Sequence, residues 1–395
     1  MKVAIIGSLA YSLINFRGVL IQRITSGGHE VVACAPDDNA AVTAALGAMG
    51  ARFRIVQMAR ASLSPLSDLR TLCALVRLLY EEKPDIILAY TQKPIIYAGI
   101  ASRIVRHGRF FPMVTGLGYA FSEDGRRKWL RSIVSSLYRL AIADASSVVL
   151  YNRDDHIELL RRGALQVNQN VTMVPGSGVD MTHFAEQPIP AGQPTFLLIA
   201  RLLHDKGLRE YVGAARIVRQ SYAHAKFQLL GPFDANPASI SVAELSQWEA
   251  EGCIEYLGQT EDVRPYLAAC SVFVLPSYRE GMPRAITEAM ATGRAIITTD
   301  VPGCRDTVTN NENGFVVPVR NSEALAEAMI HFCRDPALAF RLGKMSRQIA
   351  LRRYAVEPVN ELLLATMGLS KQPEGSIPAD CIITDEPLPG RPTLD

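Results

Sequence analysis

Residues 280–288 read Glu280-Gly281-Met282-Pro283-Arg284-Ala285-Ile286-Thr287-Glu288, a run with one acid at each end. It comes shortly after the apolar segment Val272–Leu275, and Gly293 ends the apolar residues that come after it. A proline at the first helical position loses no hydrogen bond, and glycine commonly follows a helix, so we expect a helix between Pro283 and Gly293. Glu280 then lies in the loop and Glu288 lies inside the helix. A strand, a loop and a helix in this order are typical of α/β folds.

Short apolar runs, many of them β-branched, recur along the chain and alternate with helical patterns such as Leu208–Arg219 and Ser322–Cys333. The expected strands of a first series are Val3–Ile6, Val31–Ala35, Phe53–Val56, Ile86–Tyr90, Met113–Thr115 and Val148–Tyr151, and those of a second are Phe196–Ile199, Phe227–Leu230, Ile254–Leu257, Val272–Leu275 and Ile296–Thr298. This alternation predicts parallel sheets with crossover helices. The predicted fold class is α/β, with two doubly wound, Rossmann-like domains that face each other across a cleft, where such sheets bind ligands.

The 395 residues exceed the usual limit of one hydrophobic core, so two domains of roughly 150–200 residues are expected. The segment 188–194 is rich in proline and glycine and is predicted to be the linker. The N-terminal domain then spans 1–187 and the C-terminal domain 195–355. Residues 370–395 contain five prolines and few apolar residues, which indicates a disordered tail.

The composition excludes several classes of protein. The net charge is only +2, which gives no overall attraction to nucleic acid. The seven cysteines are odd in number and scattered singly, so they indicate neither a disulfide framework nor a zinc site. The first apolar run is too short for a signal peptide, and no stretch approaches the roughly 18 apolar residues of a membrane-spanning helix. We therefore expect a cytoplasmic protein, with attachment to a membrane surface left open.

A basic pair, Arg201 and Lys206, follows the predicted strand Phe196–Ile199. Cations at this place suit a diphosphate, and the N-terminus of the helix after Glu280 offers unpaired N–H groups to the same anion. The carboxylates of Glu280 and Glu288 cannot bind phosphate, but they can accept hydrogen bonds from sugar hydroxyls. The set predicts a nucleotide-sugar site. Taken alone, the basic pair is more typical of a solvated helix start, and the alternative for Glu288 is a surface helix acid.

Four motifs occur in one order, and they read Val174-Pro175-Gly176-Ser177-Gly178-Val179-Asp180, Ile199-Ala200-Arg201-Leu202-Leu203-His204-Asp205-Lys206-Gly207, Glu280 to Glu288, and Thr299-Asp300-Val301-Pro302-Gly303-Cys304-Arg305-Asp306. Together they resemble the retaining glycosyltransferases of family four, whose signature is E-x7-E and whose fold is GT-B. The resemblance implies a donor site made of Arg201, Lys206, Glu280, Gly281, Met282, Pro283 and Glu288.

The resemblance also implies roles. Glu288 would hold the ribose, Glu280 the transferred sugar, and the amides of Gly281 and Met282 the donor. Arg201, Lys206 and Glu280 would be the catalytic residues, with the two cations stabilising the leaving diphosphate, and neither a metal nor another cofactor would be needed. Retention would follow from same-face displacement. In this family a terminal helix packs back on the first domain, and residues 356–369 are the candidate.

The acceptor side is expected on the first domain. The turn after the first strand lacks both a paired glycine and the G-x-G-x-x-G fingerprint, which argues against a nicotinamide enzyme. Candidate acceptor contacts are Asn15, Arg17, Lys93, Thr115, Gly116 and Gly118. Three segments, Thr91–Pro94, Thr115–Phe121 and Tyr151–Asp155, resemble the bacterial subgroup that acts on polyprenyl-diphosphate-linked sugars. Alternatives are open for several: Asn15 as a helix cap, Lys93 as a solvated lysine, and 115–121 as a plain loop.

Basic residues also gather around a tryptophan in the first domain. They are Arg126, Arg127, Lys128 and Arg131 around Trp129, with Arg103, Arg106, His107 and Arg109 earlier in the chain and an apolar face of Ile133, Val134, Leu137 and Leu140 following. Such a cluster suits an anionic membrane surface. Trp129 in the core is the alternative. RNA is not favoured, because no aromatic stacking set accompanies the charge.

The leading hypothesis is a retaining hexosyltransferase. It would move a hexosyl or N-acetylhexosaminyl unit from a UDP-sugar to a lipid-diphosphate-linked saccharide, at the inner face of the cytoplasmic membrane. An epimerase of GT-B architecture acting on a UDP-sugar, and a catalytically silent protein that binds a nucleotide sugar, are the alternatives. Incubation with the UDP-sugar alone separates the epimerase, which needs no acceptor.

Overall fold

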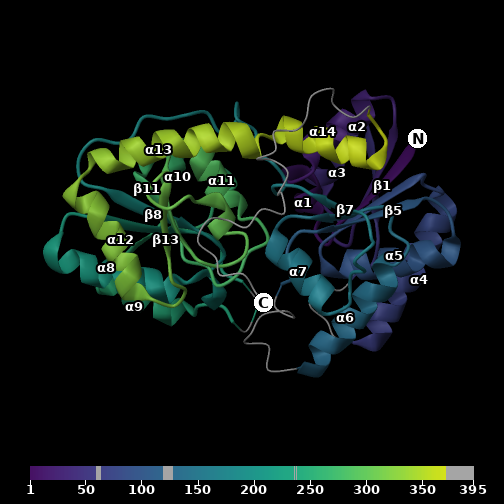
Figure 1. The fold of residues 1–395 in the computed structure, drawn as a ribbon, viewed down its shortest axis with the longest axis horizontal. Coiled ribbons are helices and arrows are strands. Elements are labelled where there is room, and N and C mark those ends of the chain that lie inside the picture. Colours follow the sequence, from purple (N-terminus) through teal and green to yellow (C-terminus); the bar gives the residue numbers. More distant parts are fainter. Residues whose placement is uncertain (59–63, 119–127, 235, 237, 371–395) are drawn as a thin grey trace.

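The computed structural model describes residues 1–58, 64–118, 128–234, 236 and 238–370, and it contains two α/β domains side by side (Figure 1). The first domain has a parallel seven-stranded sheet in the order β3-β2-β1-β4-β5-β6-β7. Its strands are β1 Lys2–Ile6, β2 Glu30–Ala35, β3 Ala51–Ile55, β4 Ile86–Tyr90, β5 Arg109–Val114, β6 Val148–Leu150 and β7 Val171–Met173. Its helices are α1 Ala10–Asn15, α2 Gly18–Ser26, α3 Ala40–Ala48, α4 Pro65–Glu82, α5 Gln92–Val105, α6 Lys128–Ile142 and α7 Arg153–Arg161.

The second domain has a parallel six-stranded sheet in the order β10-β9-β8-β11-β12-β13. Its strands are β8 Thr195–Ile199, β9 Lys226–Leu230, β10 Glu255–Tyr256, β11 Val272–Leu275, β12 Ala295–Thr299 and β13 Gly314–Val317. Its helices are α8 Leu208–Ser221, α9 Val242–Ala250, α10 Arg264–Ala269, α11 Arg284–Ala291, α12 Ser322–Arg334 and α13 Ala337–Ile349. In both sheets the strand order reverses next to the first strand, between β1 and β4 and between β8 and β11. Open α/β sheets bind ligands at such a switch point. The predicted doubly wound fold is confirmed.

Some strands differ from those predicted. β7 and β13 were not expected, because β7 is only three residues long within a polar stretch and β13 begins with a glycine. β5 begins at Arg109, although the sequence indicated a strand only from Met113. Pro112 explains the difference: it is rare inside strands, yet here its backbone lies opposite Ala89 of β4.

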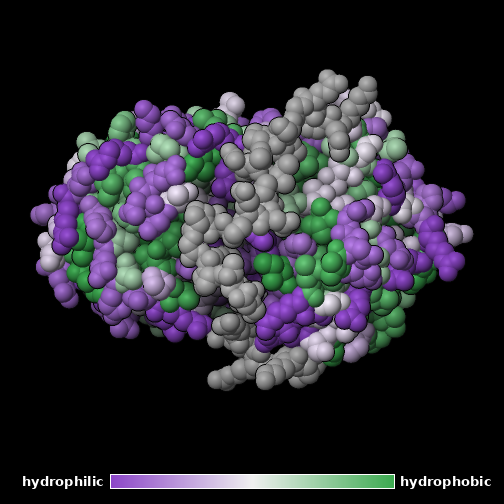
Figure 2. Space-filling view, viewed as in Figure 1, coloured by the Kyte–Doolittle hydropathy of each residue, from purple (hydrophilic) through white to green (hydrophobic). Residues whose placement is uncertain are grey.

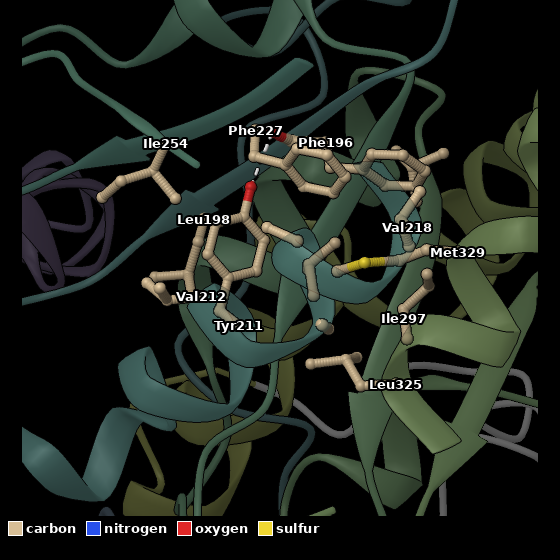
Figure 3. Close-up of a cluster of buried hydrophobic side chains, with 14 of the residues drawn as sticks. Phe196, Leu198, Tyr211, Val212, Val218, Phe227, Ile254, Ile297, Leu325 and Met329 are labelled. Carbon is tan, nitrogen blue, oxygen red and sulfur yellow. Dashed lines mark hydrogen bonds between the residues drawn. The ribbon is translucent and has the colours of Figure 1, made fainter. Parts of the chain in front are cut away.

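The core of the second domain is built around Tyr211 of α8, which is fully buried against the sheet (Figure 3). Phe196 of β8 stacks on Phe227 of β9 at 5.2 Å between ring centroids. The Tyr211 hydroxyl donates to the Phe196 carbonyl at 2.8 Å, so its polar atom is satisfied inside an apolar layer. This layer fixes the strands whose carboxyl ends carry the predicted site.

The chain passes between the domains twice. Val179 and Phe184 already pack in the core of the second domain, although the sequence placed them in the first. The chain therefore enters the second domain before the proline-rich segment 188–194. Composition indicates where the backbone is irregular, but it does not indicate against which core a residue packs. Near the C-terminus, Val356 N–H donates to the Val179 carbonyl at 3.0 Å, and α14 (Val356–Met367) returns to the first domain beside α2 (Figure 1).

The described part of the face in Figure 2 mixes hydrophilic and hydrophobic residues over both domains. Within the described ranges, no helix has both the length and the apolar character needed to cross a bilayer.

Candidate active site

Two loops of the second domain meet because β8 and β11 are neighbours in the sheet. Tyr278 N–H, after β11, donates to the Asp205 carbonyl, after β8, at 2.8 Å. Gly207 has φ +71°, and a Cβ there would lie 2.0 Å from the Pro276 carbonyl oxygen. Only glycine permits this backbone and this approach. The contact sets Lys206, at the end of the short 3-10 helix His204–Lys206, against the loop that carries Glu280.

Lys206 and Glu280 form an ion pair with 2.5 Å between Nζ and Oε1, and the side chains are 15% and 17% exposed. Ser277 Oγ donates to the same carboxylate oxygen at 2.9 Å. Burial by itself would lower the pKa of Lys206, but the Glu280 carboxylate outweighs it and the pKa is raised above its ordinary value. The ammonium therefore stays charged at neutral pH, as a phosphate ligand must.

Arg201 is more exposed than Lys206 and pairs with Asp234, with 2.6 Å between Nη1 and Oδ2. Its charge is close enough to act against the ammonium of Lys206. The two predicted cations thus lie at one edge of the sheet. Asp234 was not predicted; the available signal was its place in the loop after the strand that became β9.

The helix after Glu280 begins one residue later than predicted. Pro283 is the N-cap with φ −75° and ψ 104°, and its carbonyl accepts from Ile286 N–H at 3.0 Å. The prediction of Pro283 as first helical residue was wrong because its fixed φ suits both positions, and only ψ distinguishes them. Gly293 follows the helix with φ +83°, as expected. In the backbone hydrogen bonds of the described residues, the N–H groups of Gly281 and Met282 find no backbone acceptor.

Glu288 lies on α11 and is 12% exposed, with Arg284 Nε at 2.7 Å from its Oε1. Burial raises the pKa of Glu288, and the Arg284 guanidinium offsets part of this rise. Arg284 also donates to the carbonyl of Asn15 and lies 5.1 Å from the ring centroid of Phe16, both in the first domain. Glu288, predicted to bind the donor, therefore lies beside the interface between the two domains. Arg284 stood in the quoted motif, but nothing in the sequence indicated that it would join the domains.

Donor and acceptor candidates meet where three glycines converge. A Cβ on Gly281 would lie 1.9 Å from the Thr115 carbonyl oxygen, and one on Gly116 would lie 3.1 Å from Gly281 Cα. A Cβ on Gly303 would lie 2.5 Å from the Gly281 carbonyl oxygen. Because no side chain fits here, the backbones of the two domains approach directly. Gly118 is exposed, with φ +66°.

Arg17 is only 3% exposed and lies beside two tyrosines at the carboxyl edge of the first sheet. Its Nη2 donates to the Tyr151 hydroxyl at 2.5 Å, and its guanidinium carbon lies 4.9 Å from the ring centroid of Tyr90. Its Nε is buried without a hydrogen-bond partner, and no carboxylate pairs with it among the described residues. Asn15, by contrast, is exposed and ends α1. The capping alternative for Asn15 does not hold, since the N-cap of α2 is Arg17.

Lys93 pairs with Asp68 at 2.8 Å between Nζ and Oδ1, so the solvated-lysine alternative does not hold. Its neighbour Thr91 has φ +68°, which is strained for a residue with a Cβ. Thr91 Oγ1 and Gln92 Nε2 are buried without hydrogen-bond partners. Backbone strain and buried polar atoms without partners at the end of β4 mark a candidate binding position. The sequence indicated it only because residues 91–94 resemble the bacterial subgroup.

Part of the basic cluster lies outside the described residues, namely Arg126, Arg127 and the side chains of Lys128 and Trp129. The earlier basic residues make contacts within the fold: Arg103 pairs with Asp144 at 3.1 Å, and Arg109 donates to the Met367 carbonyl at 2.7 Å. The predicted apolar face of α6 is divided, because Ile133 and Leu140 are exposed whereas Val134 and Leu137 pack partly inside. Within the described ranges, no three His, Cys, Asp or Glu residues are grouped to hold a metal ion.

Comparisons with known proteins cover both domains. Residues 18–176 match the glycosyl transferase 4-like domain, and residues 193–335 match glycosyl transferases group 1. A Campylobacter jejuni protein, N,N'-diacetylbacillosaminyl-diphospho-undecaprenol alpha-1,3-N-acetylgalactosaminyltransferase, is 27% identical over 89% of this chain and 94% of its own. An Escherichia coli protein, UDP-Gal:alpha-D-GlcNAc-diphosphoundecaprenol alpha-1,3-galactosyltransferase, is 24% identical over 70% of this chain and 73% of its own.

Solved structures agree on the fold. Anabaena Alr3699/HepE in complex with UDP aligns with a TM-score of 0.74 and 19% identity, over 93% of this chain and 100% of that one. Sucrose-phosphate synthase from Thermosynechococcus elongatus aligns with a TM-score of 0.73 and 18% identity, over 92% and 97%. With both domains matched in order, the chain belongs to the GT-B glycosyltransferases and consists of a glycosyl transferase 4-like domain followed by a group 1 domain.

Proposed function

We propose that this glycosyltransferase moves a hexosyl or N-acetylhexosaminyl unit, with retention, from a UDP-sugar to a lipid-diphosphate-linked saccharide in bacterial surface polysaccharide or glycan assembly. The observation that carries the proposal is the pairing of Lys206 with Glu280 at the β8–β11 switch point, beside an amide-lined helix start. The Campylobacter jejuni and Escherichia coli relatives, which act on diphospho-undecaprenol-linked sugars, support the acceptor class.

The donor is proposed to bind with its diphosphate at Arg201 and Lys206 and its sugar at Glu280. The Lys206–Glu280 ion pair supports this, because an ammonium has three donors, and the bond to Glu280 leaves two of them for phosphate oxygens. The amides of Gly281 and Met282, which find no backbone acceptor among the described residues, are proposed to add donors for the anion, and Glu288 is proposed to accept from the ribose. UDP is favoured as the nucleotide because a structural neighbour was solved with it.

Retention is proposed to proceed by same-face displacement. Glu280 is the carboxylate that pairs with Lys206, and Lys206 and Ser277 donate to the same oxygen of it. A carboxylate held in this way is suited to orienting a sugar hydroxyl. The leaving diphosphate would then take the acceptor proton, while the fixed cations stabilise its charge without reorganisation. No metal enters this scheme.

The acceptor is proposed to lie over the carboxyl edge of the first sheet, among Asn15, Arg17, Thr115, Gly116 and Gly118. Arg17 supports an anionic acceptor, because its guanidinium is buried and pairs with no carboxylate among the described residues, which is costly unless another anion reaches it. Lys93 is held by Asp68 at the same edge and is proposed as a second contact to the acceptor phosphate.

Peripheral contact with an anionic membrane is proposed through the α5–α6 side. Ile104, Ile133 and Leu140 are exposed there on helices that pack against each other. Apolar side chains near basic residues suit the boundary between headgroups and acyl chains. Co-sedimentation with phosphatidylglycerol vesicles tests this, and equal binding to neutral phosphatidylcholine vesicles would refute it.

A screen of UDP-sugars against extracted lipid-linked saccharides tests the reaction itself. Product mass identifies the donor sugar and the acceptor at once, and the anomeric coupling constant of the product tests retention. The same UDP-sugars without acceptor form the control. A new UDP-sugar there would indicate an epimerase, and binding without turnover under either condition would indicate a silent binding protein.

A further inference from the structure

The start of α7 carries more polar contacts than a helix start requires. Asn152 is its N-cap, and its Oδ1 accepts from Asp155 N–H at 2.7 Å. This bond satisfies the capping requirement. The amide nitrogen of the same side chain makes a contact with the second domain, since Asn152 Nδ2 donates to the carbonyl of Gly281 at 2.8 Å. Asn152 and Asp155 are both 0% exposed.

Asp155 makes the second contact with the opposite domain. Its Oδ1 accepts from Arg279 Nη2 at 2.7 Å, and its Oδ2 accepts from Asn152 Nδ2 at 3.0 Å. We name the set Asn152, Asp155, Arg279 and Gly281 the α7 clasp. A fully buried carboxylate is expensive to maintain, and a helix cap does not need one.

The contacts of the α7 clasp lie on both sides of Glu280 in the chain. Residues 279 and 281 are held by the first domain, whereas the Glu280 carboxylate is held by Lys206 and Ser277 of the second. The position of Glu280 relative to the acceptor side therefore depends on the interface. Tolerance for displacement is small, because Gly281 already touches the Thr115 backbone with no room for a Cβ.

We propose that Asn152 and Asp155 are positioning residues for sugar transfer, which act through Gly281 and Arg279 to hold the Glu280 loop against the first domain. The proposal rests on the assignment of Glu280 to the transferred sugar. The proposal extends that assignment, because the site of sugar transfer would be complete only when the two domains are in contact. Donor binding, by contrast, needs only second-domain residues.

The first test is Asn152→Ser, which keeps a good capping residue but is too short to reach Gly281. Asn39→Ser is the matched control, because Asn39 caps α3 through the same kind of bond to Val42 N–H. We expect kcat per UDP-binding site to fall about 10- to 100-fold in Asn152→Ser, with UDP affinity within about threefold of wild type, as for a reacting group displaced by about 1 Å. The Asn39→Ser variant should match wild type in both.

The second test is a double-mutant cycle with Asp155→Asn and Arg279→Gln. Each substitution removes the same ion pair, the one between Asp155 and Arg279. The double variant should therefore lose no more kcat than the worse single variant. Losses that multiply would overturn the α7 clasp as a unit. The positioning role would be overturned if Asn152→Ser had the same kcat as Asn39→Ser. It would also be overturned if Asn152→Ser lost kcat and UDP affinity in parallel.

Hydrogen exchange separates this proposal from the donor assignment. Without any ligand, the Glu280 amide, which donates to the Pro302 carbonyl at 3.3 Å, should exchange faster in Asn152→Ser than in Asn39→Ser, and equal exchange would overturn the proposal. Failure of the wild-type chain to bind UDP would instead overturn the donor assignment and leave the exchange result standing.

Discussion

Replacement of Lys206 by methionine tests the donor site most directly, because it removes the charge and keeps most of the side-chain volume. At 2.5 Å and an effective dielectric constant of about 20, the attraction between Lys206 and Glu280 is about 7 kcal/mol before desolvation is subtracted. Removal of the ammonium leaves the Glu280 carboxylate largely buried, with Ser277 as its remaining side-chain hydrogen-bond donor among the described residues. Since both side chains keep some exposure, we expect the stability loss to be about 2–3 kcal/mol, below the 3–5 kcal/mol of a fully buried pair. This corresponds to a fall of about 5–10 °C in Tm.

Activity should fall much further than the folded fraction. A fixed cation that stabilises the leaving diphosphate contributes about 2.7–4 kcal/mol to the transition state, so Lys206→Met should lose about 10²–10³-fold in kcat. The assay is UDP release from the UDP-sugar and acceptor found by the screen, with thermal unfolding measured on the same samples. Lys344→Met, an exposed lysine of α13, is the matched control and should keep wild-type turnover. The double variant Lys206→Met/Glu280→Gln should regain stability but not activity. Turnover of Lys206→Met within threefold of wild type would refute the assignment.

Three further outcomes are expected. Gly281→Ala should lower kcat by at least about tenfold, because its Cβ would lie 1.9 Å from the Thr115 carbonyl and force the domains apart; unchanged steady-state turnover would contradict this. Glu288→Gln should weaken UDP binding about tenfold or more in calorimetry at pH 7. Because burial raises the pKa of Glu288, wild-type affinity should decline on acidification while the pH is still above 4.5, and the glutamine variant should show no such decline. Glu82, whose pKa Arg52 lowers, should stabilise the fold above pH 4.5 and lose that contribution as pH falls through its folded pKa. The Tm difference between wild type and Glu82→Gln should therefore shrink below pH 4.5, and a constant difference would count against the pairing.

The sequence predicted the fold class well for a physical reason. Alternating apolar strands and helical patterns leave few architectures open, because a helical crossover between two strands of one sheet makes them parallel. The elements that it missed, β7 and β13, are short and carry weak local signals. Pro112 shortened the prediction of β5, because its effect depends on which strands lie beside it.

The site was predicted as residue types and not as contacts. Arg201, Lys206, Glu280 and Glu288 were identified by their place after strands and by spacing. The partner of Arg201, Asp234, comes from a third strand and could be found only once β9 was placed beside β8. Arg17 was predicted as an acceptor contact, but its burial against aromatic rings was not predicted, because periodicity does not report which polar residue a sheet will cover.

The amino-acid sequence by itself determined the residue types of the candidate donor site: two cations, two acids and a helix start, in segments that follow strands, where parallel sheets bind ligands. Only the tertiary structure decided which of these groups meet. Strands β8 and β11 are separated by more than 70 residues and become neighbours through the sheet order, which brings Lys206 to Glu280. The contact of Asn152 with Gly281 spans two domains, and no local propensity encodes it. Such contacts depend on the packing of whole domains, where the burial of apolar surface fixes distances that the chain leaves free.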